Sequence, residues 1–201
     1  MNKSIELPQL TIKALQDGAS IMIVPCKVEC MALKGDIPCA LTLEQKAIPL
    51  IEFSSLQAGD KNVFVKEEFI GNIGNCENYC WYKADDSQGE YYREKWQPAS
   101  QMTKEQSRFS IDVNDVRVVR VQDLTVLGVL GLEWIVNGET WGTFRQDIEY
   151  HFNNLMQEYE DTHFTETGEK ISLGRYEDSP YVFLYDVKVT TKEFYKETKD
   201  K

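Results

Sequence analysis

Histidine is scarce in this sequence. His151 and His163 are the only two histidines among 201 residues. His151 falls within a segment of helical periodicity, and no cluster of histidine, cysteine or aspartate at metal-ligand spacing surrounds either ring. We therefore expect no metal site and no nucleophilic triad built on histidine, and we expect no cofactor.

Long apolar runs are also missing. A bilayer span needs about 20 consecutive apolar residues, whereas the longest runs here, such as residues 21–24, have the length of a strand. Residues 1–6 lack the apolar segment of a signal peptide. These absences predict a cytoplasmic protein that does not enter a membrane.

Basic charge is in deficit. Acidic residues outnumber basic ones by 33 to 22, which gives a formal net charge of −11. Lysine and arginine dominate the affinity of proteins for nucleic acid, and a field of this sign repels a polyanion at long range. Bulk duplex DNA is therefore not an expected partner, although a local basic patch is compatible with this composition.

The five cysteines favour reduced thiols, because the count is odd and no signal peptide precedes them. Two C-x3-C pairs, Cys26 with Cys30 and Cys76 with Cys80, suggest a zinc site on first inspection. Zinc knuckles usually place their ligands closer together, with a glycine-rich turn that neither pair has. We therefore interpret these cysteines as small buried apolar side chains.

Hydrophobic residues make up 42% of the chain, enough for a folded core. Periodicity predicts a short helix near residues 10–15 that ends at Gly18, and a longer helix over residues 141–159 with one apolar stripe. Residue types and alternation predict strands over residues 21–31, 62–70, 80–84, 109–121 and 180–189. Pro25 is expected at the edge or a bend of the first strand. These elements indicate a single α+β domain over residues 1–189 and a charged tail over residues 190–201.

The strand at residues 109–121 changes phase along its length. Phe109, Ile111 and Val113 share one face, whereas Val116 and Val118 repeat in the opposite phase. A period of two cannot change phase without an extra residue. We therefore predict a bulge or sharp bend at residues 114–115, and such a bend favours a small, strongly bent sheet or mixed β-barrel flanked by helices.

An ordered series of short segments resembles the phage and prophage branch of the ASCH-domain family, which has a PUA-like β-barrel fold. The segments are DG at 17–18, GDKNVFVKEEF at 59–69, YKAD at 82–85, KWQP at 95–98, VNDVRVVRVQDL at 113–124 and SPYVF at 179–183. The resemblance implies a PUA-like barrel with a cleft that binds RNA or modified nucleosides. Some relatives hydrolyse acylated cytidines or cleave RNA with lysine, threonine and glutamate in that cleft.

The sequence departs from the family pattern where the catalytic residues would lie. The segment after Gly18 should be basic, but residues 19–24 contain no lysine, arginine or threonine, and Ser20 offers the only hydroxyl. Glu67 matches the family's glutamate, Lys66 stands where arginine is common, and Phe69 replaces tryptophan. A general base needs an ionisable partner within hydrogen-bond reach, and the segment that would supply one lacks it.

Six residues are candidates for a site, each with a plainer alternative. Glu67 is the candidate acid/base and Lys66 a ligand-binding neighbour, unless this charged strand end simply faces water. Lys95 and Trp96 would bind phosphate and stack a base, unless Trp96 is an aromatic plug. Ser20 offers a hydroxyl, and Arg117 would bind a phosphate, unless it pairs with nearby acids at the surface.

Three functions follow from these residues. The first is a non-catalytic ASCH-like module of a phage or prophage protein that binds a small ligand or a single-stranded nucleotide in a barrel cleft, with RNA or a nucleoside as the candidate partner. The second is a hydrolase of modified nucleosides or RNA that uses Glu67. The third is an accessory factor that binds another protein through its acidic surface, as the charge of −11 suggests.

Overall fold

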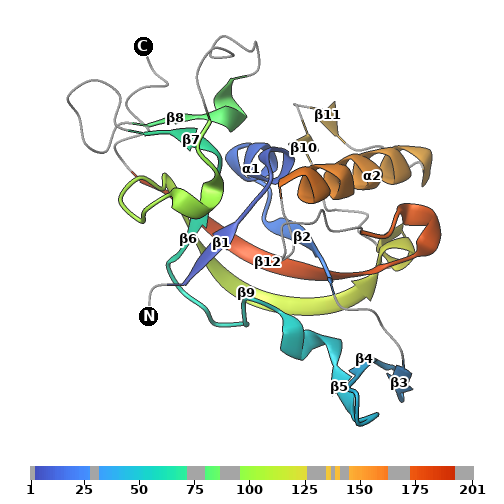
Figure 1. The fold of residues 1–201 in the computed structure, drawn as a ribbon. Coiled ribbons are helices and arrows are strands. Elements are labelled where there is room, and N and C mark those ends of the chain that lie inside the picture. Colours follow the sequence, from blue (N-terminus) through green and yellow to red (C-terminus); the bar gives the residue numbers. More distant parts are fainter. Residues whose placement is uncertain are drawn as a thin grey trace.

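A curved five-stranded sheet forms the centre of the protein in this computed structural model, with strand order β1-β6-β9-β12-β2 (Figure 1). The structure describes residues 3–27, 32–71, 80–86, 96–125, 135–136, 139–140, 145–162 and 173–192. The central strands are β1 (Ser4–Glu6), β2 (Ile21–Pro25), β6 (Val63–Lys66), β9 (Phe109–Arg120) and β12 (Tyr181–Thr191). Strand β1 runs parallel to β6, and the other neighbours are antiparallel. With helices α1 (Gln9–Gln16) and α2 (Arg145–Thr162), the predicted α+β class is confirmed.

Helix α1 links the two edges of this sheet. Strands β1 and β2 are the edge strands, and the chain passes from one to the other through α1. One apolar cluster contains side chains of all five strands together with Ile12 and Leu15 of α1. A helix therefore closes the concave face where the sequence predicted a closed barrel, and no sheet among the described residues closes on itself.

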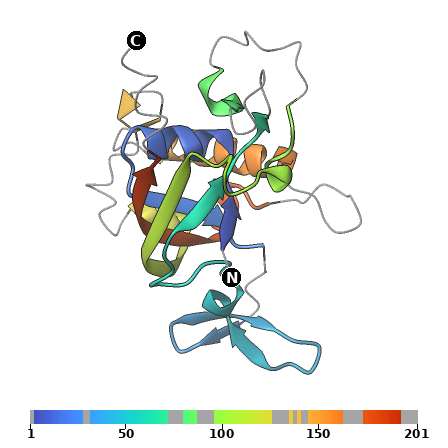
Figure 2. The ribbon, with the colours of Figure 1, turned by 90° about the vertical axis from the view of Figure 1, so that its left-hand side faces the viewer.

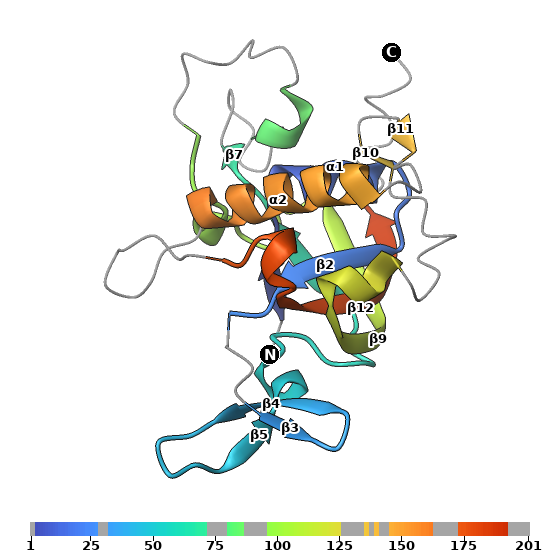
Figure 3. The same ribbon diagram turned by 90° about the vertical axis from the view of Figure 1, so that its right-hand side faces the viewer.

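Helix α2 covers the opposite face of the sheet (Figure 3). Three residues of the predicted apolar stripe, Phe152, Leu155 and Tyr159, are buried against strands β2 and β12. The stripe is therefore confirmed over these three residues. Alternate residues of β12 supply the two faces, because successive side chains of a strand point to opposite sides. The cluster on the α1 side contains Phe183, Tyr185 and Val187, and the cluster on the α2 side contains Val182 and Leu184. These five residues follow the alternation predicted from the sequence.

The predicted bulge is confirmed at Asn114. Val113 pairs with Val187 and Asp115 pairs with Asp186, which leaves Asn114 as the extra residue. Its Nδ2 donates a hydrogen bond to Oδ1 of Asp186 at 2.9 Å. The extra residue keeps the apolar side chains on both sides of the bulge in contact with the same cluster.

Two smaller sheets lie beside the central one. Strands β3 (Ala32–Lys34), β4 (Ile37–Leu41) and β5 (Ala47–Pro49) form a projecting sheet (Figure 2), followed by the 3₁₀ turn η1 (Leu50–Phe53). Strands β7 (Phe69–Ile70) and β8 (Trp81–Tyr82) pair near the 3₁₀ turns η2 (Lys83–Asp85) and η3 (Ala99–Gln101). The remaining elements are η4 (Val121–Thr125), the hairpin β10 (Ile135–Val136) and β11 (Glu139–Thr140), and η5 (Tyr176–Asp178).

Several predicted boundaries differ from the structure. The strand predicted over 62–70 is divided into β6 and β7. The strand predicted over 21–31 ends at Pro25, and this proline lies on an edge strand, as expected. Strand β12 extends to Thr191, into the segment predicted as a tail. Strand β1 lies over residues 4–6, where the sequence predicted no strand. None of the described helices is long and apolar enough to cross a membrane.

Candidate functional site

A cleft of about 590 Å³ lies where the start of α1, the β6–β7 junction, η2, η3 and α2 meet. The junction between β6 and β7 brings Glu67 and Glu68 to one wall, and α2 supplies the opposite wall. The lining side chains are Glu6, Leu7, Pro8, Gln9, Leu10, Lys13, Glu67, Glu68, Lys83, Ala84, Pro98, Ala99, Ser100, Asn154, Gln157, Glu158 and Asp161. Its volume falls within the range of small-molecule sites.

Carboxylates dominate the charge of this cleft. Five acidic residues line it, Glu6, Glu67, Glu68, Glu158 and Asp161, against the two lysines Lys13 and Lys83. Lys83 and Glu68 neutralise each other, because Nζ of Lys83 lies 2.6 Å from Oε2 of Glu68, which leaves Lys13 against the other four acidic residues. The cleft therefore favours neutral or positively charged ligands over anions.

Glu67 forms a buried ion pair with Arg108. Arg108 donates from Nε to Oε1 of Glu67 and from Nη2 to Oε2, at 2.8 Å in both cases. Glu67 is 2% exposed and Arg108 is 5% exposed. Two parallel hydrogen bonds of this kind are the strongest arrangement an arginine makes with a carboxylate, and they occupy both oxygens of the predicted acid/base.

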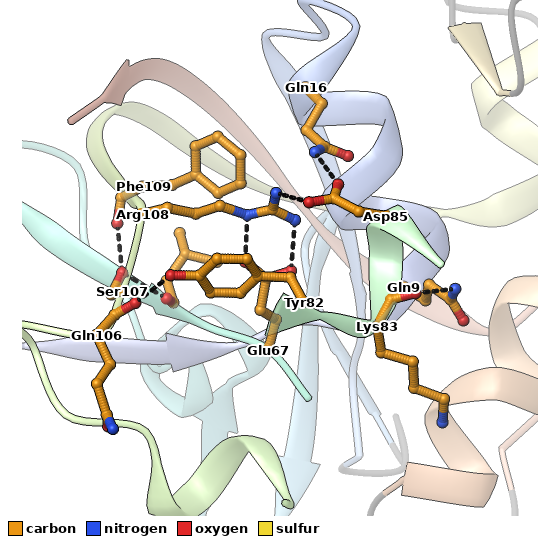
Figure 4. A network of polar contacts seen from close by, with 11 residues as sticks. Gln9, Gln16, Glu67, Tyr82, Lys83, Asp85, Gln106, Ser107, Arg108 and Phe109 are labelled. Atoms are coloured by element: carbon orange, nitrogen blue, oxygen red, sulfur yellow. Dashed lines mark hydrogen bonds and ion pairs between the residues drawn. The ribbon is translucent and has the colours of Figure 1, made fainter. Parts of the chain in front are cut away.

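The guanidinium of Arg108 is held on its other sides as well (Figure 4). Its Nη1 donates to Oδ2 of Asp85 at 2.5 Å, and Asp85 in turn accepts a hydrogen bond from Gln16 of α1. The guanidinium carbon lies 4.2 Å from the ring centroid of Tyr82 and 4.9 Å from that of Phe109. Arg108 thus connects the start of β9 with β8, η2 and α1.

Burial and the neighbouring charges act in opposite directions on this pair. Burial raises the pKa of Glu67, and the Arg108 guanidinium acts against that rise. Burial lowers the pKa of Arg108, but Glu67 and Asp85 outweigh it and raise the pKa above its ordinary value. Arg108 therefore remains a cation, and the two hydrogen bonds to Glu67 are those of an ion pair.

Glu158 caps the first turn of α1 from the neighbouring helix. The N-cap position is Pro8, whose side chain makes no capping hydrogen bond. The backbone N–H of Leu10 donates to Oε2 of Glu158 at 3.0 Å, which satisfies one of the donors left open at a helix start. Burial raises the pKa of Glu158, and the hydrogen bonds from the helix backbone oppose that rise.

Lys66 and Trp96 lie close to the cleft but do not line it. Lys66 donates from Nζ to the carbonyl of Ser100 at 3.1 Å, which ties β6 to η3. Trp96 is half-buried and precedes Gln97, whose backbone pairs with Phe69. Lys95 lies outside the described residues.

Ser20 and Arg117 lie elsewhere in the fold. Ser20 is exposed at the start of β2, where its carbonyl accepts a hydrogen bond from Val187. Arg117 is exposed on β9 with its Nε 3.4 Å from Oδ2 of Asp115, so the predicted surface ion pair is confirmed. Of the predicted site residues that the structure describes, only Glu67 lines the cleft.

The sequence prediction missed the partner of Glu67 and its burial. The alternation of Val63, Val65 and Phe69, all buried, also places Glu67 on the inward side, and this signal was available in the sequence. Arg108 carries no comparable signal, because it lies 41 residues from Glu67 and precedes the apolar alternation of β9.

Neither C-x3-C pair is fully described. Cys26 is half-buried, and Cys39 and Cys80 are buried, whereas Cys30 and Cys76 lie outside the described residues. Within the described ranges, no group of three or more histidine, cysteine, aspartate or glutamate residues is arranged to hold a metal ion. His163 and the side chain of His151 also lie outside them.

The cleft and its ion pair are the features on which a function can be argued. No protein-family model, curated protein or solved structure matches this chain.

Proposed function

We propose that this chain is a non-catalytic binding module that holds a small neutral or cationic organic ligand, such as a nucleoside, in the cleft. The observation that carries the proposal is the occupation of both Glu67 oxygens by Arg108. A general acid or base must reach the reacting proton directly or through one water. Glu67 is 2% exposed and each of its oxygens already accepts a hydrogen bond from a guanidinium, so it is poorly placed to reach a substrate in the cleft.

The ligand class follows from the lining of the cleft. Gln9, Asn154 and Gln157 offer amide donors and acceptors, and Leu7, Pro8 and Pro98 offer apolar contact. Such a mixture suits a nucleobase, whose edge forms hydrogen bonds and whose faces are apolar. Outside the ion pairs with Lys83 and Arg108, three acidic residues and one lysine line the cleft, and this balance disfavours phosphate. Among the expected ligands, a nucleoside is therefore favoured over a phosphorylated nucleotide or RNA.

The ASCH-like, PUA-like relationship and a phage or prophage origin are part of this proposal. The ordered sequence segments support it, and so does a small curved sheet whose concave face is filled by one apolar cluster. In the described residues, helix α1 closes the concave face of the sheet. A complete PUA-like barrel is a part of the proposal that goes beyond the α+β class.

A steric block of the cleft tests binding without disturbing the ion pair. Ser100 and Gln101 are neighbours in η3 and both are exposed, but only Ser100 lines the cleft. Cytidine, adenosine and their monophosphates would be titrated into the protein and followed by NMR chemical shifts. We expect nucleosides to bind more tightly than the monophosphates, Ser100→Trp to abolish binding and Gln101→Trp to retain it. Equal binding by the two variants, or no binding by wild type at millimolar nucleoside, contradicts the proposal.

The hydrolase alternative has its own assay. Acylated cytidines incubated with wild-type protein are expected to remain intact, because Glu67 is not available to a substrate. Turnover by wild type that Glu67→Gln abolishes, with the variant still folded by circular dichroism, would restore the hydrolase as the better assignment.

A second candidate function is binding of a basic segment of another protein, and the acidic lining of the cleft favours it. A lysine-rich peptide titrated under the same conditions distinguishes the two. Tighter binding of the peptide than of any nucleoside, lost in Ser100→Trp, would favour the protein-binding factor.

A further inference from the structure

A second hollow, of about 450 Å³, lies among the starts of β6 and β9 and the end of β12. Its lining side chains are Lys3, Asp60, Lys61, Asn62, Phe64, Lys104, Phe109, Ser110 and Lys192. It shares no lining residue with the cleft at Glu67. It is therefore a separate site, and its chemistry is independent of the function proposed above.

This basic hollow has a charge opposite to that of the chain as a whole. Four lysines and one aspartate line it, whereas the complete chain carries a net charge of −11. Asp60 is engaged by Lys3, whose Nζ lies 2.7 Å from the carboxylate, and Lys61 lies 3.4 Å from Asp112. The remaining two lysines have no carboxylate at ion-pair distance among the described residues.

Lys192 is fixed at one side of the hollow by the backbone. Its Nζ donates to the carbonyls of Lys104 and Glu105 at 2.7 and 3.1 Å, and its own N–H donates to the carbonyl of Arg108. Burial lowers the pKa of Lys192, and the charge of Lys104 lowers it further, against the opposing effect of Glu105. Both Lys104 and Lys192 line this hollow, so the fold places two lysines around one space, an arrangement that a bound anion stabilises.

Phe64 adds an apolar surface to the same hollow. Its side chain is half-buried on β6, and Nζ of Lys66 lies 5.7 Å from its ring centroid. Ser110 contributes a hydroxyl, and Asn62 an amide. Ammonium groups and hydrogen-bonding side chains suit a phosphate group. The ring of Phe64 suits an apolar or planar group that is attached to that phosphate.

We propose that the basic hollow binds a chain of phosphate groups, either free polyphosphate or the phosphates of a nucleotide. Lys61, Lys104 and Lys192, which all line the hollow, supply the ammonium groups for the phosphates. The volume of about 450 Å³ accommodates more than a single phosphate. Phe64 distinguishes the two sources, because a ring stabilises a stacked base and contributes nothing to an inorganic anion.

Calorimetric titration with pyrophosphate and tripolyphosphate at low salt tests the site. Lys104→Gln removes one ammonium without removing the backbone carbonyl that Lys192 uses. Because a hydrogen bond to a charged group is worth about 1.5–3 kcal/mol, we expect it to weaken binding roughly tenfold or more. The matched control is Lys34→Gln, which makes the same charge change at an exposed lysine of the projecting sheet and is expected to leave affinity unchanged.

Three further outcomes complete the test. Double substitution of Lys104 and Lys192 by glutamine is expected to abolish binding, with folding checked by circular dichroism. Tighter binding of adenosine triphosphate than of tripolyphosphate, with the difference removed by Phe64→Leu, identifies a nucleotide; equal binding identifies free polyphosphate. No binding of any of these anions to wild type at millimolar concentration, or equal weakening by Lys34→Gln, overturns the proposal.

Discussion

Arg108 holds both carboxylate oxygens of Glu67 at 2.8 Å in a site where both side chains are almost completely buried. The pair joins the β6–β7 junction to the start of β9, and its third contact, to Asp85, extends it to η2 and α1. A glutamate in this position serves the fold by pairing a buried cation. The same contact is the reason why we propose a binding function for this cleft instead of hydrolysis.

Replacing Arg108 by methionine is expected to destabilise the protein by about 3–5 kcal/mol, because Glu67 would be left buried and unpaired. Urea denaturation measures the change. The double variant Glu67→Leu with Arg108→Met is expected to recover a large part of the loss, since neither charge then remains buried.

Arg117→Met is the control for this prediction, because Arg117 is exposed and its ion pair with Asp115 is a surface pair. Its effect is expected to stay within about 0.5 kcal/mol. If Arg108→Met were no more destabilising than this control, the buried pair would not have the structural role assigned to it.

The bulge at Asn114 leads to a prediction about deletions in β9. Removing Asn114 takes out the unpaired residue and leaves Val113 opposite Val187 and Asp115 opposite Asp186. Removing Arg117 instead shifts Val118 and every later residue of the strand to the opposite face. We expect deletion of Asn114 to leave a folded protein that has lost about 1–2 kcal/mol, and deletion of Arg117 to cost more than about 4 kcal/mol.

Thermal unfolding followed by circular dichroism compares the two deletions directly. Equal loss of stability in the two deletions would contradict this prediction. It would show that the sheet needs the bulge for its curvature as much as it needs the correct register of β9. Glycine at position 114 provides a milder variant, in which the bulge persists but the hydrogen bond to Asp186 is lost.

The parts of the fold that the sequence predicted are those in which burial repeats along the chain. The alternation of Phe109, Ile111 and Val113 predicted β9, and the phase change at Val116 predicted the bulge. The short strand β1 has only three residues and pairs with β6 about 60 positions later, so it leaves no local period. Helix α1 closes the concave face through tertiary packing. No local sequence pattern predicts such packing.

The candidate site was less accessible to prediction than the fold. Glu67 lines the cleft and is buried, whereas the plainer alternative for the charged triplet at 66–68 was exposure to water. Its partner lies on another strand, and charge pairing across 41 residues has no periodic signature. Ser20 and Arg117 were candidates by residue type alone, and the fold places neither of them in the cleft.

Glu160 gives the protein a predictable sensitivity to acid. Its carboxylate accepts hydrogen bonds from Nη1 and Nη2 of Arg175 at 2.9 and 2.8 Å and from the backbone N–H of Leu173 at 2.6 Å. The hydrogen bonds from Arg175, then that from Leu173, lower the pKa of Glu160 against the opposing effect of burial. A folded-state pKa below the unfolded value means that the unfolded chain binds more protons, so stability rises with pH over this range.

The contribution of Glu160 is therefore present above the ordinary glutamate pKa of about 4.3 and is lost as pH falls through the lower, folded-state value. Glu160→Gln is expected to cost on the order of 1 kcal/mol at neutral pH, a modest amount because Arg175 is partly exposed to solvent. The difference between wild type and variant should shrink as pH falls below about 4. Urea denaturation across pH measures it, with Glu177→Gln, a change at an exposed carboxylate, as the control. A difference that stayed constant with pH would show that Glu160 acts through packing instead of through its charge.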